Sequence, residues 1–376
     1  MARPWLSALR SDLDSWFQRK TSQLVEEPLQ PLPRTQRFSL LQRIAALDAP
    51  PSVQSYVHKE LTEAITGWRN NPEAANVMVV LGRPVESVAP VLEAVTAAWI
   101  EPSIPWHALL PCHHRPVDPA AVSLRLTDAL ENSLPASDSG TILVSLPNLD
   151  QCFLRCIDGW SGFTLLRQLI LERRDCFWLM GCNSWAWQFL DHVSQISSYV
   201  PTVRTLPPLS GAELRDWLAP VATTLEIIKP NESAPVPAAT WASEAEGDEV
   251  DLWSQLAELS SGSHRIASEI WVESLRVHPD GEGKQLHPTR YALPDFPSLM
   301  DEDRYILHSL LIHGRIRREH LAFGLSLPCH RLQPRIQWLL GEELIRESAE
   351  ELSVRPWHYP SLVKEMANSN LFTGEL

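Results

Sequence analysis

A loop that follows a continuous apolar run carries residues whose spacing could bind phosphate. The run spans residues 77–81, and Gly82-Arg83-Pro84-Val85-Glu86-Ser87-Val88-Ala89-Pro90 comes directly after it. A phosphate-binding loop needs glycines that let backbone N–H groups turn inward, a Lys that reaches the phosphate oxygens, and a Ser or Thr that binds Mg²⁺. When the loop is aligned on Gly82, the positions of the second Gly, the Lys and the hydroxyl hold Ser87, Val88 and Ala89. Only Gly82 therefore matches.

The charges and prolines of this loop also oppose phosphate binding. Glu86 brings a carboxylate to the place of the phosphates, and Pro84 and Pro90 have no amide donor. Arg83 is a cation, but it does not stand at the lysine position. Phosphoryl transfer depends on positioning and charge stabilisation, so the joint loss of the Lys and the Mg²⁺ hydroxyl predicts a chain without that activity.

Polar residues also follow two later apolar runs. The run at 141–146 leads into Pro147-Asn148-Leu149-Asp150, so its acidic residue comes late, although Asp150 could still lie near a metal. The run at 176–181 is followed by Asn183, and parallel sheets place ligand-facing groups at strand ends of this kind. In the alternative interpretation, Asn183 caps the following helix and the nearby Trp residues pack in the core.

Three other groups of reactive side chains do not form a recognisable site. Cys112-His113-His114, with His107, lacks a second cluster, and adjacent residues on a strand face opposite sides. Cys152 and Cys156 could face each other on a helix, but two thiols do not complete a tetrahedral site. Gly159-Trp160-Ser161-Gly162 does not follow a buried strand, as a nucleophilic Ser at a strand-to-helix turn would. We expect no metal and no catalytic residue.

Alternating apolar runs and helical stretches predict how these residues are positioned. Helices are expected at 88–99 and 163–172, between the apolar runs. Strands that alternate with helices imply right-handed crossovers and a three-layer α/β fold with a parallel sheet. Before this region, apolar residues at helical spacing predict three more helices, at 5–17, 40–47 and 53–68.

The segment after the predicted sheet is helical. Ser210 and Glu213 predict a capping box, and Ser263 is a candidate N-cap within a helical pair at 252–275. Residues 229–251 interrupt this pattern. They are rich in Pro, Ala, Ser and acidic residues and predict a solvated insertion or linker.

Residues 281–288 predict a linker to a C-terminal winged helix. Three helices and a short hairpin are expected there, at 305–313, 318–323, 332–340 and 344–354. The third helix carries Arg331 and Arg335, which could contact DNA phosphates. Residues 291–376 hold 9 Lys and Arg against 12 Asp and Glu, whereas DNA-reading modules carry a basic face. Protein docking is therefore favoured over DNA binding.

This order of elements resembles the AAA+ and STAND types of P-loop ATPase, over about residues 75–376. The resemblance implies that 77–81 is the strand before the Walker A loop and that 141–150 corresponds to Walker B. It further implies that Asn183 is a sensor-1 residue and that Arg265, near Gly262, lies where a lid carries sensor 2. The expected fold is α/β, a P-loop NTPase-like three-layer parallel sheet with N-terminal helices, a helical lid and a C-terminal winged-helix domain. The corresponding domain ranges are 1–73, 74–205, 206–280 and 289–376.

Composition narrows the class of protein. The chain has 376 residues and a formal net charge of −14, so it has no general attraction for nucleic acid or an anionic membrane. No window reaches the roughly 20 apolar residues of a membrane span, and residues 1–20 lack the apolar core of a signal peptide. The six scattered cysteines predict neither a disulfide framework nor a zinc ribbon. A soluble, cytoplasmic protein is expected.

The leading hypothesis is a catalytically inactive AAA+-like protein, a pseudo-ATPase with a degenerate Walker A loop. It would act as an assembly or regulatory subunit, and its expected partner is an active ATPase or a second copy of the chain. Aromatic residues are candidate interface anchors, namely Trp5, Trp16, Trp68, Trp185 and Trp187. No cofactor and no membrane insertion are expected.

Two alternatives stay open. The first is a switch that binds ATP or ADP through a non-standard loop, with the site residues Gly82, Arg83, Asp150, Asn183 and Arg265. The second is a winged-helix DNA-binding regulator that uses Arg331 and Arg335.

Overall fold

The protein is described here from a computed structural model. The described residues are 29–71, 73–99, 106–110, 112–133, 142–227, 236–237, 252–277, 285–289 and 291–374. The predicted helix at 5–17 lies outside them, as does the predicted insertion at 229–251 except for residues 236–237.

Five parallel strands form the central sheet, in the order β3-β4-β5-β2-β6. Their bounds are β2 Val77–Gly82, β3 Trp106–Leu109, β4 Ile142–Leu146, β5 Cys176–Asn183 and β6 Val203–Thr205. Every residue of β2, β4 and β5 is buried, because helices cover both faces of the sheet and leave no side of these strands to water. The three strands predicted from apolar runs are confirmed; the short edge strands β3 and β6 carry no comparable run.

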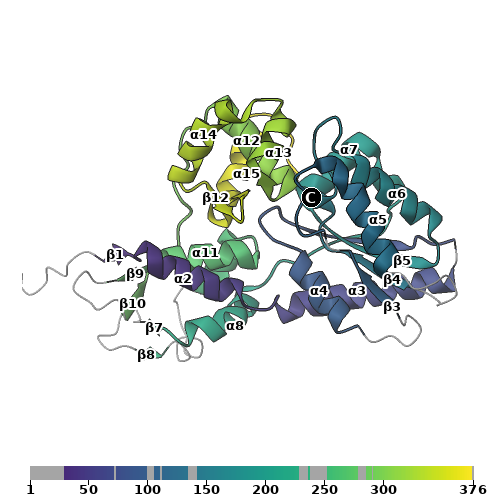
Figure 1. The fold of residues 1–376 in the computed structure, drawn as a ribbon. Coiled ribbons are helices and arrows are strands. Elements are labelled where there is room, and N and C mark those ends of the chain that lie inside the picture. Colours follow the sequence, from purple (N-terminus) through teal and green to yellow (C-terminus); the bar gives the residue numbers. More distant parts are fainter. Residues whose placement is uncertain are drawn as a thin grey trace, which may run out of the picture.

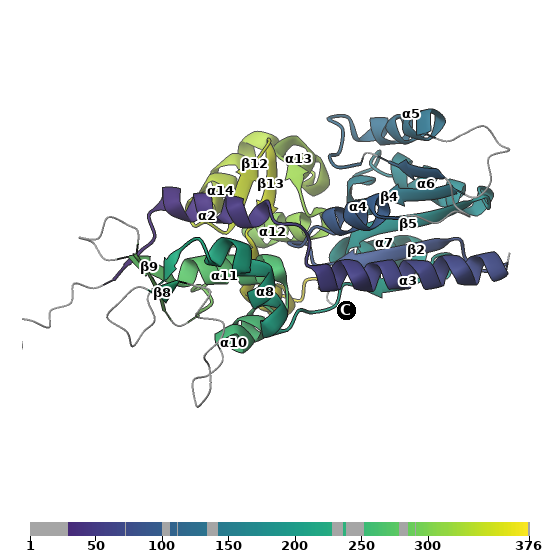
Figure 2. The same ribbon diagram turned by 90° about the horizontal axis from the view of Figure 1, so that it is seen from below.

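Helices cover the two faces of the sheet, as Figures 1 and 2 show. Met78 and Val80 belong to the core under α3 (Pro51–Asn70) and α4 (Ala89–Ala97), where Trp68 of α3 lies 5.5 Å from Phe177 between ring centroids. The alternate residues Val77 and Val79 face the other core. That core is covered by α5 (Val122–Ser133), α6 (Ser161–Glu172) and α7 (Ser184–Ser194). The predicted three-layer α/β fold is confirmed.

The lid consists of α8 (Gly211–Ala222), α10 (Leu252–Leu259) and α11 (His264–Ser274). The predicted capping box is present, since the Ser210 amide donates to Glu213 over 2.9 Å and the Glu213 amide donates to Ser210 Oγ over 3.3 Å. Ser263 caps α11 as predicted. The N-terminal helix α2 (Arg34–Ala45) packs on α11 and α8.

A small second sheet beside the lid is not predicted from the sequence. Its strands have the order β1-β9-β10-β7-β8. Their bounds are β1 Gln30–Pro31, β7 Glu226–Ile227, β8 Val236–Pro237, β9 Leu275–Val277 and β10 Gln285–Pro288. The prediction of a linker at 281–288 is wrong for β10, which pairs with β9 and β7. These strands are too short to show an alternating pattern.

The C-terminal domain is the predicted winged helix. Its elements are α12 (Asp301–His313), β11 (Ile316–Arg317), α13 (Arg318–Leu325), α14 (Cys329–Gly341), β12 (Ile345–Ser348) and β13 (Glu351–Val354), and α15 (Tyr359–Asn368) follows. Short 3₁₀ turns occur at η1 Pro119–Ala121, η2 Leu149–Gln151, η3 Ile196–Ser198 and η4 Pro356–His358. Every helix in the described ranges is too short or too polar to cross a bilayer.

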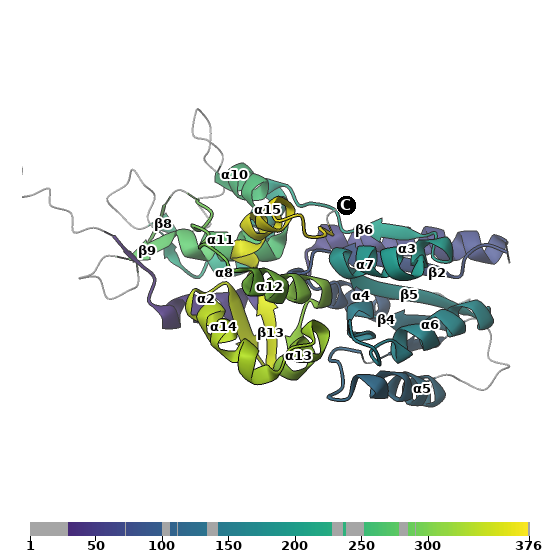
Figure 3. The same cartoon turned by 90° about the horizontal axis from the view of Figure 1, so that it is seen from above.

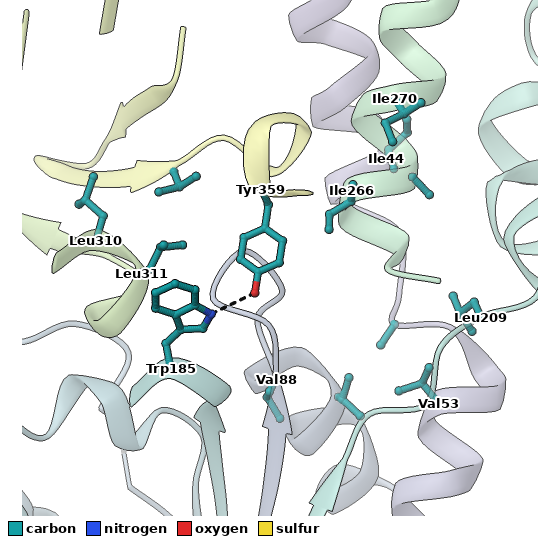
Figure 4. Packing of buried hydrophobic residues seen from close by; sticks show 14 of the residues in the cluster. Ile44, Val53, Val88, Trp185, Leu209, Ile266, Ile270, Leu310, Leu311 and Tyr359 are labelled. Carbon is teal, nitrogen blue, oxygen red and sulfur yellow. Dashed lines mark hydrogen bonds between the residues drawn. The ribbon is translucent and has the colours of Figure 1, made fainter. Parts of the chain in front are cut away.

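One hydrophobic cluster joins the α/β domain, the lid and the winged helix. Figure 4 shows Trp185 of α7 among winged-helix residues, with its indole N–H donating to the Tyr359 hydroxyl over 3.1 Å. Trp68, Trp185 and Trp187 are only 8%, 0% and 5% exposed. Their prediction as surface anchors is therefore wrong, because each buries its ring between elements of this chain; the alternative interpretation of Trp185 and Trp187 as core residues is confirmed. Trp5 and Trp16 lie outside the described residues.

Candidate functional site

The crevice at the carboxyl ends of β2 and β5 is where this sheet would hold a ligand. The two strands are neighbours, and Gly82 pairs with Asn183 at their last positions. The chain runs from β2 to one edge of the sheet, at β3, and from β5 to the other edge, at β6. Open α/β sheets bind ligands where the strand order reverses in this way. Gly82, Asn183 and the predicted Asp150 meet at this crevice.

Gly82 lets the following loop fold back on itself. A Cβ atom at this position would lie 2.7 Å from Cγ2 of Val88 and 3.0 Å from the main-chain oxygen of Glu86. Within the loop, the Glu86 amide donates to the oxygen of Arg83 over 2.8 Å. Gly82 therefore allows the loop to pack closely. The Glu86 amide is already used in a hydrogen bond within the loop.

Glu86 and Arg83 bind this loop to the lid. The buried Glu86 carboxylate lies 2.8 Å from Nδ1 of His264 and accepts a hydrogen bond from Ser263 Oγ over 3.1 Å. Arg83 donates to the main-chain oxygen of Ser261 over 2.9 Å. Burial alone would raise the pKa of Glu86, but the hydrogen bond and charge of His264, together with Arg83, hold that pKa below its ordinary value. The carboxylate is therefore a structural anion.

Asp150 has hydrogen-bond partners within its own domain. Its Oδ2 accepts from Nε2 of Gln151 over 2.8 Å, and its main-chain oxygen accepts from the guanidinium of Arg115 over 2.7 Å. Burial raises the pKa of Asp150, although Gln151 and Arg115 offset part of the rise. Arg115 is only 1% exposed, and burial lowers its pKa to about 10.

Asn183 uses both ends of its side-chain amide. Its Oδ1 accepts from the Ala186 amide over 2.7 Å and caps α7, which confirms the alternative interpretation of this residue. Its Nδ2 donates to the main-chain oxygen of Ile312 over 3.0 Å. The predicted ligand-facing group therefore contacts the winged helix.

The end of α12 packs against one side of the crevice. Gln151 Nε2 donates to the main-chain oxygen of His313 over 2.9 Å, beside the bond from Asn183 to Ile312. Gly314 follows with φ 63°, and a Cβ there would lie 3.4 Å from Oδ2 of Asp150. The last carbonyls of a helix have no partner within it and carry its negative end, so donors from the α/β domain satisfy them here.

Four residues of this crevice are not singled out by the sequence. They are Arg115, Gln151, His264 and His313, and they stand in no motif. His313 is fully buried; burial and the nearby charge of Arg115 lower its pKa well below the ordinary histidine value. His264 reaches the crevice from the lid and His313 from the winged helix, so both depend on how these domains pack on the sheet.

A cleft of about 1060 Å³ includes the open side of the crevice, since Asn148, Asp150, Cys182 and Asn183 line it. It is lined by the loop at 84–90, one face of α2, the start of α11 and the β12–β13 hairpin, which we call the wing. Arg265 lines it, and within the described residues no ion pair or hydrogen bond involves its guanidinium. Burial and the nearby Arg346 of the wing lower the pKa of Arg265.

An ionic network holds the winged helix against the lid. Arg355 lies 2.6 Å from Glu343 and 3.0 Å from Glu273 of α11. Arg37 of α2 bridges the same two carboxylates, at 2.9 Å from Glu343 and 3.0 Å from Glu273. Although burial would raise the pKa of Glu343, its hydrogen bond with Arg37 and the surrounding arginine charges hold it below its ordinary value. This ionic network therefore joins α2, α11 and the winged helix.

The two arginines considered for DNA contact have acidic partners. Nε of Arg335 donates over 2.7 Å to Asp303, whose side chain is fully buried at the start of α12. Arg331 lies 3.4 Å from Glu302, an exposed pair. The tip of the wing is exposed, and Ser348 and Ala349 line the cleft.

The predicted absence of a metal site stays a prediction. Among the described residues no three acidic, His or Cys side chains are grouped to hold an ion. His113 faces Glu93 at 3.6 Å, whereas His114 lies 2.9 Å from Glu351 of the wing. The side chain of His107 is outside the described set.

Comparison with known proteins gives fold similarity at low sequence identity. No protein-family model matches the chain, and no curated protein does. Cdc6p from Pyrobaculum aerophilum is 12% identical, with 89% of this chain and 98% of that chain covered and a TM-score of 0.36. A variant of RuvB from Thermotoga maritima is 17% identical, with 82% and 94% covered and a TM-score of 0.34. The ORC1 protein of Aeropyrum pernix, solved in complex with DNA, is 14% identical, with 88% and 98% covered and a TM-score of 0.37.

The strand order with β2 between β5 and β6, followed by a helical lid and a winged helix, decides the fold. It is the P-loop NTPase-like α/β fold, with a helical lid and a winged helix, that the sequence predicts. The fold implies ATP and Mg²⁺ at the crevice, but the residues present do not fit them. The loop carries the buried anion Glu86, and the side-chain donors of Asn183 and Gln151 are bonded to α12. These residues therefore give no basis for a catalytic step on a nucleotide.

Proposed function

We propose that this AAA+-fold chain is a non-hydrolysing subunit that assembles with, or regulates, another protein. The observation that carries the proposal is the docking of Ile312, His313 and Gly314 on Asn183, Gln151 and Asp150. These contacts use the side-chain donors of Asn183 and Gln151, which are then not free to bind a nucleotide in the crevice. Carbonyl oxygens at the negative end of a helix would also repel phosphate.

The loop sequence supports the same proposal. Where an ATPase of this fold needs a Lys and a hydroxyl, the chain has Val88 and Ala89. Glu86 supplies a negative charge that is held by His264 of the lid. Each of these features opposes the stabilisation of a transferring phosphoryl group.

The expected partner is an active ATPase of the same fold or a second copy of this chain. The resemblance to AAA+ proteins implies oligomers in which neighbouring subunits complete each other's sites. A chain without the phosphate-loop Lys and hydroxyl would occupy such a position and fix the geometry of its neighbour without turnover.

The test combines a nucleotide assay with a measurement of mass. We expect no ATP hydrolysis and no rise in melting temperature with millimolar ATP, ADP and Mg²⁺, because a ligand that binds the folded state must raise its stability. The chain tagged in its native source should be recovered at a fixed ratio with an ATP-hydrolysing P-loop protein, or as a homo-oligomer. A nucleotide-dependent rise that Arg265→Gln abolishes, with Arg331→Gln unchanged as a control, would contradict the proposal and favour the switch alternative.

A further inference from the structure

Arg265, near the start of α11, lines the cleft without a partner of its own. Within the described residues its guanidinium makes neither a hydrogen bond nor an ion pair. Burial and the positive charge of Arg346 lower the pKa of Arg265, so the two guanidinium groups lie near enough to repel each other. Because a nearby negative charge stabilises the charged form of a cation, an anion that entered the cleft beside both groups would be attracted by both.

Arg265 belongs to a cluster in which arginines outnumber carboxylates. The cluster lies where α2, the lid and the winged helix meet, and Figures 2 and 3 show α2 beside α11 and the wing. We call it the arginine cluster; its members are Arg34, Arg37, Arg265, Arg346 and Arg355, with Glu269, Glu273 and Glu343. Three carboxylates for five arginines leave an excess of two positive charges.

Glu269, on the same helix as Arg265, is already shared. Its carboxylate lies 3.4 Å from Arg355 and 3.6 Å from Arg346. It also accepts a hydrogen bond from the Trp357 amide over 3.2 Å. Arg346 keeps 53% of its side chain exposed in spite of this pair. The excess charge of the arginine cluster therefore resides mainly on Arg265 and Arg346, which both line the cleft.

The other carboxylates of the cleft have contacts outside the arginine cluster. They are Glu86 with His264, Asp150 with Gln151, Glu93 with His113, Glu347 with Arg318 and Glu351 with His114. The arginine cluster thus stays locally positive in a chain whose formal net charge is −14. Salt screens exposed charges beyond about 8–10 Å, so a ligand in the cleft is governed by the cluster more than by the distant acidic surface.

The cleft suits an acidic peptide better than a small anion. Its volume of about 1060 Å³ exceeds what an inorganic anion fills. Phe38, which is 62% exposed, and Leu41 line the cleft from α2, close to the arginine cluster, and Val354 lines it from the wing. A peptide that carries carboxylates and a large apolar side chain would contact both kinds of lining, whereas phosphate would contact the cations alone.

We propose that the arginine cluster binds an acidic segment of a partner protein, with carboxylates paired to Arg265 and Arg346 between the lid and the wing. An apolar side chain of the segment packs on Phe38. Guanidinium groups suit this role, because their fixed fork of donors matches a carboxylate and gives strong, charge-assisted hydrogen bonds. The inference rests on the proposed function, since it names the chemistry that would hold the partner.

Fluorescence anisotropy on the full-length chain tests the proposal. The probe is a labelled dodecapeptide of Glu-Glu-Leu repeats, and the control peptide has Gln in place of every Glu. We expect the acidic peptide to bind, with an affinity that falls as salt rises, and the Gln peptide not to bind. Phe38→Ser should weaken binding of the acidic peptide several-fold.

Arginine variants locate the binding site. Arg265→Gln and Arg346→Gln should each weaken binding about tenfold, since each removes a hydrogen bond to a charged group. Arg265→Gln breaks no ion pair among the described residues, so the melting temperature should stay near that of the unsubstituted protein. Arg331→Gln is the matched control, because Arg331 is an exposed arginine outside the cleft.

Three results would overturn the proposal. The first is absent binding of the acidic peptide, and the second is equal affinity of Arg265→Gln and Arg331→Gln. The third is displacement of the peptide by millimolar phosphate or ATP but not by NaCl of equal ionic strength, which would assign the arginine cluster to small anions. Because binding is measured without nucleotide, ATP hydrolysis by the chain would contradict the proposed function alone, and absent peptide binding would contradict this inference alone.

Discussion

Asn183, the last residue of β5, donates its side-chain amide to the main-chain oxygen of Ile312 over 3.0 Å. The bond joins the central crevice of the sheet to the end of α12, 129 residues later in the chain. The same side chain caps α7 through its oxygen. The side-chain amide of Asn183 therefore both caps the start of α7 and binds the winged helix to the sheet.

The two roles of Asn183 can be separated by substitution. Asn183→Ala removes both the cap and the donor, and we expect it to lower the free energy of unfolding by about 2 kcal/mol. Asn183→Asp keeps an oxygen that can cap α7 but removes the donor to Ile312. Hydrogen exchange should accelerate at 184–187 and 312–315 in the first variant, and only at 312–315 in the second. Equal acceleration at α7 in both variants would refute this separation.

Glu86 should matter for stability and not for phosphate binding. Glu86→Gln removes the buried carboxylate that pairs with Arg83 and accepts from Ser263 and His264, and we expect a loss of about 3 kcal/mol in urea unfolding. The control is Glu93→Gln, because Glu93 is 40% exposed and its contact with His113 should contribute less than about 1 kcal/mol. A stabilising Glu86→Gln, as would follow if this carboxylate repelled a bound anion, would contradict our interpretation of the loop.

Gly314 is required by backbone geometry. With φ at 63°, Gly314→Ala forces an L-residue into the left-handed region, and we expect a loss of about 1–2 kcal/mol. Its new Cβ would also contact Asp150 at 3.4 Å. Gly341→Ala is the matched control, since Gly341 ends α14 with no atom within 4 Å of an added Cβ. Thermal unfolding of the two variants should differ clearly; equal melting temperatures would refute the requirement.

Acid should destabilise the folded chain through buried histidines. Burial and the charge of Arg355 lower the pKa of His358 to about 4 from an ordinary 6.5. The unfolded chain therefore binds a proton more readily, so the free energy of unfolding should fall as pH drops from 6.5 to 4, by about 3 kcal/mol for this residue. The pKa of His313 is lowered too and acts in the same direction.

The contribution of His358 can be isolated with a variant that does not titrate. His358→Phe keeps a ring beside Phe296 and Trp357, and urea unfolding at several pH values should give a shallower slope than in the unsubstituted protein. An unchanged slope would show that His358 does not bind its proton more weakly in the folded state.

The two arginines of α14 should differ in their contribution to stability. Arg335→Ala leaves the buried Asp303 without a cation, and we expect a loss of about 3 kcal/mol. Arg331→Ala removes an exposed pair with Glu302 and should cost less than about 1 kcal/mol. Urea unfolding compares them. Equal stabilities, together with salt-dependent DNA binding that both variants lose, would favour the DNA-binding alternative.

Sequence alone was sufficient for elements whose signal is local. Buried on both faces, β2, β4 and β5 show as continuous apolar runs, and Ser210 with Glu213 marks a helix start because a capping box involves only four neighbouring residues. The order along the chain of these three strands, the lid and the winged helix followed from the same local patterns, whereas the edge strands β3 and β6 and the strand order within the sheet did not. The missing Lys and hydroxyl of the phosphate loop are also plain from residue types.

Tertiary structure decided what the crevice contains. Ser263 bonds Glu86 across 177 residues, and Gln151 bonds His313 across 162, so no spacing in the sequence marks these pairs. The tertiary structure also decided that Trp185 is a core residue. The sequence could not decide this, because an indole at the start of a helix can pack equally well against a partner protein or against the winged helix of the same chain. Local patterns predict elements, but the contacts between distant elements depend on how the domains pack.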